Sequence, residues 1–395
     1  MLTRADLLTW TAGWLVISVV LVLSRFTSAD PDSALYAQIS ARLAEGPPAR
    51  WIAPEWWGLW ESEGLFREHP AGVFFLPVLL GSAGIPVEQA AYIVGVGAGA
   101  LCLVLAGVLV SRVTSIADGR AVLVLLQLMP VAFIFRLRSN HEYLMLAALL
   151  GLVLALDALK RHWGWGAAVA LALVAALLVK GVFVIFLLLA AALWIVFDPT
   201  PGPPARGRQI AAMAAGAAAM LAVAAWYDAA YLRVTGESFW VPYWRRQMGQ
   251  VEVLSLGDQA LQLLVRVGFY IGVPLWHAAP WSVGLLAAAW RGWGSLRERL
   301  RRPWPASTRG VPAAALFVCA SITLLSPSSR YAERYIFAGT YVLAMLGAVV
   351  TRHAWPSLTE RLTAIDRRLP GLPALLWLVL VLMRLAAGPF LPRPS

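Results

Sequence analysis

Long apolar runs alternate with shorter polar stretches along most of the chain. The runs cover about residues 7–24, 88–110, 121–136, 142–159, 163–179, 181–197, 210–227, 262–289, 311–326, 335–351 and 372–388. A helix of about 20 apolar residues matches the thickness of the hydrocarbon core of a bilayer. The pattern therefore predicts an all-α polytopic membrane protein, a single domain over residues 1–395 with about eleven transmembrane helices.

Two apolar runs depart from the simple pattern. The run at 7–24 is followed by Thr27 and Ala29, whose small-x-small spacing is also found at signal-peptide cleavage sites. We favour an uncleaved first helix, because the run is long for a signal peptide and many spans follow. The run at 71–84 is short and flanked by proline, so we expect a partly inserted helix on the outer side. A full span there would invert the topology of everything after it.

The composition agrees with a membrane protein. Apolar residues make up 60% of the chain and charged residues 13%, whereas soluble proteins carry about 25% charged residues. Cys102 and Cys319 lie in apolar runs, so neither a disulfide framework nor a metal cluster is predicted. The net charge of +11 is spread over short loops, which argues against a nucleic-acid partner.

The distribution of charge predicts the orientation. With the amino terminus inside, the cytoplasmic parts hold 17 of the 32 Lys and Arg but 7 of the 21 acids, a net charge of +10. The remaining residues carry a net charge of +1, and cytoplasmic loops are expected to hold the Lys and Arg excess. The basic loop at 291–309 then contacts anionic lipid. Two polar segments, 26–87 and 228–260, lie outside.

The first outer segment begins with two acids and ends with a third. Asp30 and Asp32 precede an amphipathic helix that we expect to run to Gly46. An N-cap role is the simplest explanation for such acids, since a carboxylate accepts backbone N–H bonds at a helix start. The other end of the segment holds Glu68 and His69, which gathers carboxylates and an imidazole at one membrane depth.

Further ionisable residues lie at hinges between spans on the same side. Such residues at membrane depth are costly and usually functional. Several basic hinges facing one compartment would form a phosphate site, because guanidinium and ammonium groups bind phosphate oxygens strongly. Arg136 and Arg138 could instead be anchors that reach the interface. The hinge residues are Arg138, His141, Glu142, Lys180, Arg330, Arg334 and Tyr335.

Other polar or aromatic residues have simpler explanations. Sugar stacking is one role for the tryptophans of the first outer segment, but we favour an interfacial aromatic belt, and these residues are Trp51, Trp56, Trp57 and Trp60. His277 lies within an apolar run beside Pro274, and we expect a helix kink with a satisfied polar side chain. The chain has no P-loop, metalloprotease motif, Gly-x-Ser-x-Gly motif or zinc-type Cys pair.

From about residue 10 to 350, the order of these elements resembles the GT-C superfamily. The similarity is to the bacterial branch related to protein O-mannosyltransferases and the aminoarabinose transferase of lipid A. An acid four positions before an aromatic matches Asp32 and Tyr36, although the second acid of the family pattern is replaced by Ser33. Glu68-His69-Pro70 stands where relatives often have Glu-Lys-Pro. The remaining matches are Glu142, Lys180-Gly181, Pro280-Trp281-Ser282 and Arg334-Tyr335.

The resemblance implies an inverting transfer of a sugar from a polyprenyl-phosphate donor to an envelope acceptor on the periplasmic face of a bacterial inner membrane. The acceptor would be a lipid, a glycan or a protein. By the same resemblance Asp32 is the general base and Glu142 a second acid of the acceptor site, while Lys180, Arg334 and His69 bind the phosphate. The further substrate-binding residues are Asp30, Tyr36, Glu68, Arg138, His141, Arg330 and Tyr335.

Two other function classes fit the same sequence. A transporter or flippase for lipid-linked sugars would use the charges as a path, but the halves of the chain have no visible symmetry. A structural subunit of an envelope complex would tolerate the loss of Asp32. No cofactor is predicted with certainty: the outer acids could hold a divalent cation, but they lack a ligand spacing, so metal dependence stays open.

Overall fold

The computed structural model describes most of the chain between residues 30 and 358. The described ranges are 30–56, 64–129, 137–139, 141–197, 203–248, 256–299, 310–328 and 331–358, with residues 2, 7, 11, 14, 15, 18, 19, 22, 132, 135, 360, 361 and 364. The last predicted span, 372–388, lies outside these ranges, and so does most of the first. Arg136, Arg330, Trp57 and Trp60 are also outside them.

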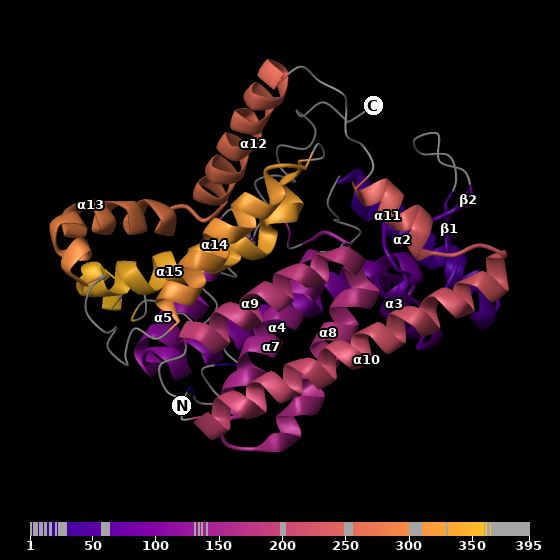
Figure 1. The fold of residues 1–395 in the computed structure, drawn as a ribbon, viewed down its shortest axis with the longest axis horizontal. Helices are drawn as coiled ribbons and strands as arrows, with labels where there is room; N and C mark the ends of the chain where they lie inside the picture. The colour runs from indigo at the N-terminus through magenta and orange to yellow at the C-terminus, as the bar shows by residue number, and fades with distance from the viewer. Residues whose placement is uncertain are drawn as a thin grey trace.

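The secondary structure of the described residues is helical apart from one short hairpin, which confirms the predicted fold class (Figure 1). The helices of the first half are α2 (Pro31–Glu45), α3 (Gly72–Ser82), α4 (Val87–Val113), α5 (Ile116–Leu125), α7 (Glu142–Ala158), α8 (Gly166–Lys180) and α9 (Val184–Phe197). Those of the second half are α10 (Pro203–Thr235), α11 (Trp240–Met248), α12 (Leu256–His277), α13 (Trp281–Arg299), α14 (Val311–Leu325) and α15 (Phe337–Ala354). Short 3-10 turns are η1 (Pro48–Arg50), η2 (Leu126–Leu128), η3 (Trp163–Trp165), η4 (Gly181–Phe183) and η6 (Glu333–Ile336).

Four helical runs in the described part are long and apolar enough to cross a membrane. They are Val87–Val113, Trp163–Phe197, Pro204–Thr235 and Glu333–Ala354. The pair Gly257–His277 and Trp281–Trp290 passes the same test together, with a bend of 108°. The predicted kink at His277 is thereby confirmed, since His277 is the last residue of α12. The count of eleven spans stays a prediction, because α5 and α7 are shorter and other predicted spans are not fully described.

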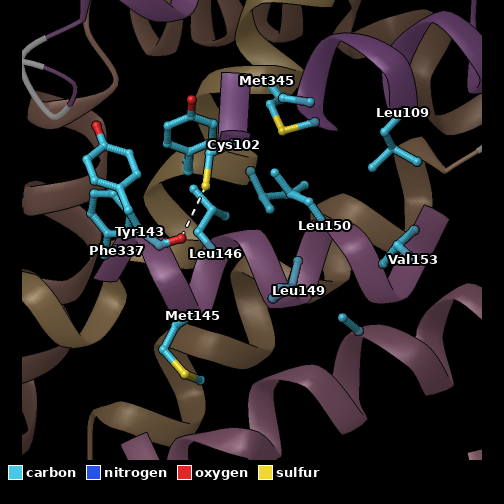
Figure 2. Packing of buried hydrophobic residues seen from close by; sticks show 14 of the residues in the cluster. Cys102, Leu109, Tyr143, Met145, Leu146, Leu149, Leu150, Val153, Phe337 and Met345 are labelled. Atoms are coloured by element: carbon cyan, nitrogen blue, oxygen red, sulfur yellow. Dashed lines mark hydrogen bonds between the residues drawn. The ribbon is translucent and has the colours of Figure 1, made fainter. Parts of the chain in front are cut away.

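Apolar packing around α7 forms the centre of the bundle. Leu146 and Leu150 of α7 are buried in the same cluster as Cys102 of α4 and Met345 of α15 (Figure 2). The Cys102 thiol donates a hydrogen bond to the Tyr143 carbonyl at 3.2 Å. With apolar lipid outside, close packing and such hydrogen bonds hold membrane helices together.

A glycine brings the Arg138 hinge against α4. A Cβ added at Gly95 would lie 2.5 Å from the Arg138 carbonyl oxygen. Only a residue without a side chain lets the two backbones approach so closely. The hinge before α7 therefore rests directly on α4.

A second buried cluster covers one end of the bundle, and we call it the outer cluster. There α2, α3, α11 and the hairpin of β1 (Glu55–Trp56) and β2 (Gly64–Leu65) gather (Figure 1). The hairpin is antiparallel, with Glu55 opposite Leu65. The buried aromatic residues of the outer cluster are Tyr36, Trp56, Phe66, Phe74, Tyr227, Tyr231, Phe239 and Tyr243.

One sequence expectation for this end is wrong. Trp56 is buried in the outer cluster rather than exposed in an interfacial belt, because it packs edge-on against Phe66. The helix that contains the span expected at 210–227 is α10, which continues to Thr235. Gly236, with φ of 78°, ends α10 in the left-handed conformation typical of helix ends.

The predicted amphipathic helix of the first outer segment is α2, and it ends before Gly46 as expected. The short helix expected at 71–84 is α3, whose 11 residues are fewer than a span requires. The helix that follows the bend after His277 is α13, and it packs along α15. Of the candidate site residues, Asp32 lies in α2, Glu142 in α7, Lys180 in α8 and Arg334 in η6.

Candidate active site

The first predicted acid, Asp32, forms an ion pair with Arg334. Asp32 lies in the first turn of α2, and Arg334 lies in η6, directly before α15. The Asp32 side chain is 41% exposed and that of Arg334 is 23% exposed. The pair therefore joins two segments from opposite ends of the described chain at an accessible position.

The N-cap role falls to Asp30. Its Oδ2 accepts hydrogen bonds from the Ser33 backbone N–H at 3.1 Å and from the Ser33 hydroxyl at 2.7 Å. Ser33, which replaces the second acid of the family pattern, thus supports the cap. Because Asp30 caps α2, the carboxylate of Asp32 is available for another partner.

A second ion pair is buried at the start of α7. The Lys180 Nζ lies 3.2 Å from Glu142 Oε1, and both side chains are almost fully buried. His141 Nε2 lies 3.2 Å from the same oxygen. A buried charge is costly unless it is paired, and an acid is further stabilised at a helix amino terminus. Glu142 and Lys180 therefore hold each other in place.

Three rings lie beside this pair. His69 packs edge-on against His141, with ring centroids 4.5 Å apart, and both rings lie near Tyr36. Burial, together with His141 and the positive charge of Lys180, holds the pKa of His69 well below its usual value. The environment of His69 therefore does not support the cationic role expected from the sequence.

Glu68 is held by α11 instead of pointing to the two ion pairs. The Arg246 Nη2 lies 3.0 Å from Glu68 Oε1, and the guanidinium also lies over the Trp56 ring. Gln247 Nε2 donates to the Glu68 carbonyl at 2.9 Å. These contacts fix the position of the segment that carries His69.

Arg138 is shared between two carboxylates. Its Nη2 lies 3.0 Å from Glu333 Oε1, and its Nη1 lies 4.0 Å from Asp30 Oδ1. His277 Nε2 contacts Glu333 Oε2 at 3.4 Å. Arg138 thus joins the start of α2 to η6 and contributes less free positive charge than the sequence suggested.

A small cavity is lined by the buried Glu142–Lys180 pair and by Arg334, the partner of Asp32. Its lining includes Glu142, Lys180, Arg334 and Tyr335, with the apolar side chains of Met145, Leu149, Phe183, Phe186, Leu187, Phe337 and Ala338. Within the described ranges, Glu142 Oε2 and Arg334 Nε are buried without a hydrogen-bond partner. Unpaired buried polar atoms are unusual, and they are available to a polar ligand.

The structure thus brings together Asp32, Glu142, Lys180, Arg334 and Tyr335, and it packs Tyr36, His69 and His141 beside them. The matched Trp281 lies elsewhere: its indole donates to the Leu125 carbonyl at 2.7 Å, which is a packing role. Sequence reasoning missed Glu333 and Arg246. Glu333 could have been found, since it directly precedes Arg334, whereas no signal in the sequence indicates Arg246.

In the part of the chain with described coordinates, no group of three or more His, Cys, Asp or Glu residues is arranged to hold a metal ion.

Neither a protein-family model nor a curated protein matches the chain. Solved structures do match it. ArnT from Cupriavidus metallidurans bound to undecaprenyl phosphate matches with a TM-score of 0.66 and 17% identity, over 88% of this chain and 61% of that chain. The same protein in the apo state matches with a TM-score of 0.63 and 18% identity, over 88% of this chain and 62% of that chain.

The likeness confirms the predicted fold, because the helices are arranged as in the ArnT chains. The chain spans about three fifths of the length of the ArnT chains that it matches. At such identity the comparison concerns the arrangement of the helices, and function has to be argued from the site.

Proposed function

We propose that the chain is a membrane glycosyltransferase that moves a sugar from a polyprenyl-phosphate donor to an acceptor on the outer face of a bacterial inner membrane. One observation carries the proposal: Glu142, Lys180 and Arg334 line one cavity of the helix bundle, and Arg334 pairs with Asp32. The fold likeness supports it, because the ArnT structure is described as bound to undecaprenyl phosphate.

Lys180 and Arg334 are the proposed ligands of the donor phosphate. Both line the cavity, and both lie beside aromatic rings that exclude water, since Lys180 Nζ is 4.5 Å from the Phe183 ring centroid. When the bond from the sugar to the phosphate breaks, negative charge grows on the departing lipid phosphate. Fixed cations in a site of low dielectric stabilise that charge most effectively.

Asp32 is the proposed general base. Its carboxylate pairs with Arg334, and Arg334 lines the cavity. A donor phosphate that takes over Arg334 would leave Asp32 to accept the proton of the acceptor hydroxyl. The acceptor oxygen then attacks the sugar carbon opposite to the departing phosphate, so the configuration at that carbon inverts.

Glu142 is the proposed second acid of the site. Its Oε1 faces both Lys180 and His141, and its Oε2 has no partner among the described residues. One oxygen can therefore hold Lys180 while the other accepts a hydroxyl of the sugar or the acceptor. The rings of Tyr36, His69 and His141 close this side of the site against water.

The test is a transfer assay with purified full-length protein in detergent. Radiolabelled polyprenyl-phosphate sugar is mixed with envelope extract, and release of the sugar from the lipid is measured. We expect release by the wild-type protein. If the protein in vesicles moved the labelled lipid across the vesicle membrane without releasing the sugar, this result would favour a transporter and contradict the proposal.

A further inference from the structure

Helix α11 contacts the hinge that carries Lys180. Tyr243 of α11 is almost completely buried, and its hydroxyl lies at the junction of α8 and η4. The hydroxyl accepts a hydrogen bond from the Val182 backbone N–H at 2.8 Å. It donates one to the Lys180 carbonyl at 3.2 Å. One side chain thus satisfies a backbone donor and a backbone acceptor on either side of Gly181.

The hinge needs such a partner because the helix breaks there. Gly181 has φ of 56° and ψ of −116°, so the backbone leaves the helical path directly after Lys180. Backbone groups at a helix break lose their regular partners, and leaving them unpaired in an apolar environment is costly. A Cβ at Gly181 would lie 2.3 Å from the Tyr243 hydroxyl oxygen. The glycine therefore leaves the space that the hydroxyl occupies.

Tyr243 is itself held firmly. Its ring stacks on Phe239 with centroids 5.4 Å apart. The start of α11 is fixed by Asp228, whose Oδ1 accepts from the Phe239 N–H at 2.7 Å and the Trp240 N–H at 3.3 Å. The far end of the helix is tied to Glu68 through Arg246. A hydroxyl on so well fixed an element can determine where the hinge lies.

We propose that Tyr243 is a positioning residue of the donor site. The Tyr243 hydroxyl holds the backbone on both sides of Gly181 and so fixes the end of α8. The side chain of Lys180, the last residue of α8, is thereby directed to the cavity, where its ammonium group lies beside Glu142. This inference rests on the proposed function, in which Lys180 binds the donor phosphate. Tyr243 itself does not line the cavity.

Tyr227 provides a matched control. Its hydroxyl is also buried in the outer cluster, accepts from the Ala71 N–H at 2.9 Å and donates to the Ile52 carbonyl at 3.0 Å. Tyr243→Phe and Tyr227→Phe each remove two backbone hydrogen bonds and keep the ring. Both should lower the melting temperature to a similar extent. Only Tyr243→Phe should weaken binding of undecaprenyl phosphate, by about threefold to tenfold, as expected for hydrogen bonds that act indirectly.

The decisive experiment is a double-mutant cycle on undecaprenyl phosphate binding by the purified full-length protein. If Tyr243 acts through Lys180, Tyr243→Phe should change binding less than about twofold in a Lys180→Met background. Additive effects of the two substitutions, or an equal loss of binding in Tyr227→Phe, would overturn the positioning role while leaving the donor site intact. A wild-type protein that does not bind undecaprenyl phosphate would overturn the proposed function, and this inference with it.

Discussion

The carboxylate of Asp32 in the first turn of α2 pairs with the guanidinium of Arg334, which lies directly before α15 and far away in the sequence. The proposed base and a proposed phosphate ligand thus neutralise each other before substrate binds. Under the proposed function, donor binding and activation of the base are coupled, because a phosphate that engages Arg334 competes with Asp32.

Loss of Arg334 should weaken binding of the donor without unfolding the protein. Arg334 is partly exposed, so its ion pair contributes little to stability. A charge-assisted bond to phosphate contributes about 1.5 to 3 kcal/mol, so Arg334→Ala should weaken undecaprenyl phosphate binding roughly ten- to a hundredfold. Equilibrium binding and a melting curve on the same sample test this. Unchanged affinity would remove Arg334 from the donor site.

Loss of Lys180 should have two separable effects. Lys180→Met leaves the buried Glu142 carboxylate without its main cation, which typically costs about 3 to 5 kcal/mol of stability. In the double variant Lys180→Met with Glu142→Gln the buried charge is gone, so most of the stability should return while donor binding stays weak. Melting temperature and donor affinity measured together separate the effects. Recovery of donor binding in the double variant would contradict a phosphate role for Lys180.

The sequence could predict the long apolar helices, the helix α2 and the order of the charged hinges. The length of an apolar run and the capping residue at a helix start are local features that can be read along the chain. The pairing of each acid with its cation could not be predicted in this way. Asp30 and Asp32 look equivalent at a helix start, and only the packed structure gives the cap to one and Arg334 to the other. Tyr243 carries no motif at all, because its partners are backbone groups distant in sequence.

Acid should destabilise the protein partly through His69. Its pKa in the folded state is lowered by burial, by His141 and by Lys180, whereas the unfolded value is about 6.5. Below about pH 6.5 the unfolded chain therefore binds a proton that the folded protein does not, and stability falls as the pH is lowered towards the folded pKa.

The substitution His69→Gln removes this proton uptake and should flatten the fall in stability below about pH 6.5. Melting temperature is measured from pH 8 downwards in detergent for both proteins. The same slope in both would show that His69 does not contribute to acid sensitivity.

Cysteine labelling tests the orientation. Gln38 is exposed on α2 and Arg161 is exposed between α7 and η3, so each can be replaced by cysteine with little effect on packing. The background should carry Cys319→Ser, because Cys319 is the exposed native cysteine. An impermeant thiol reagent added to intact cells should label Gln38→Cys and not Arg161→Cys. Labelling of Arg161→Cys alone would place the site on the cytoplasmic face.

The role of Asp32 as the base is tested most directly by the turnover of Asp32→Asn compared with Asp30→Asn. Asparagine keeps the shape of aspartate and can cap a helix, but it cannot accept a proton as a base. Asp32→Asn should therefore melt like the wild type while sugar transfer falls by about 10² to 10⁴, the usual contribution of a general base. Asp30→Asn keeps the cap of α2 and should retain most of its turnover. Near-normal transfer by Asp32→Asn, or a larger loss in Asp30→Asn, would contradict the account.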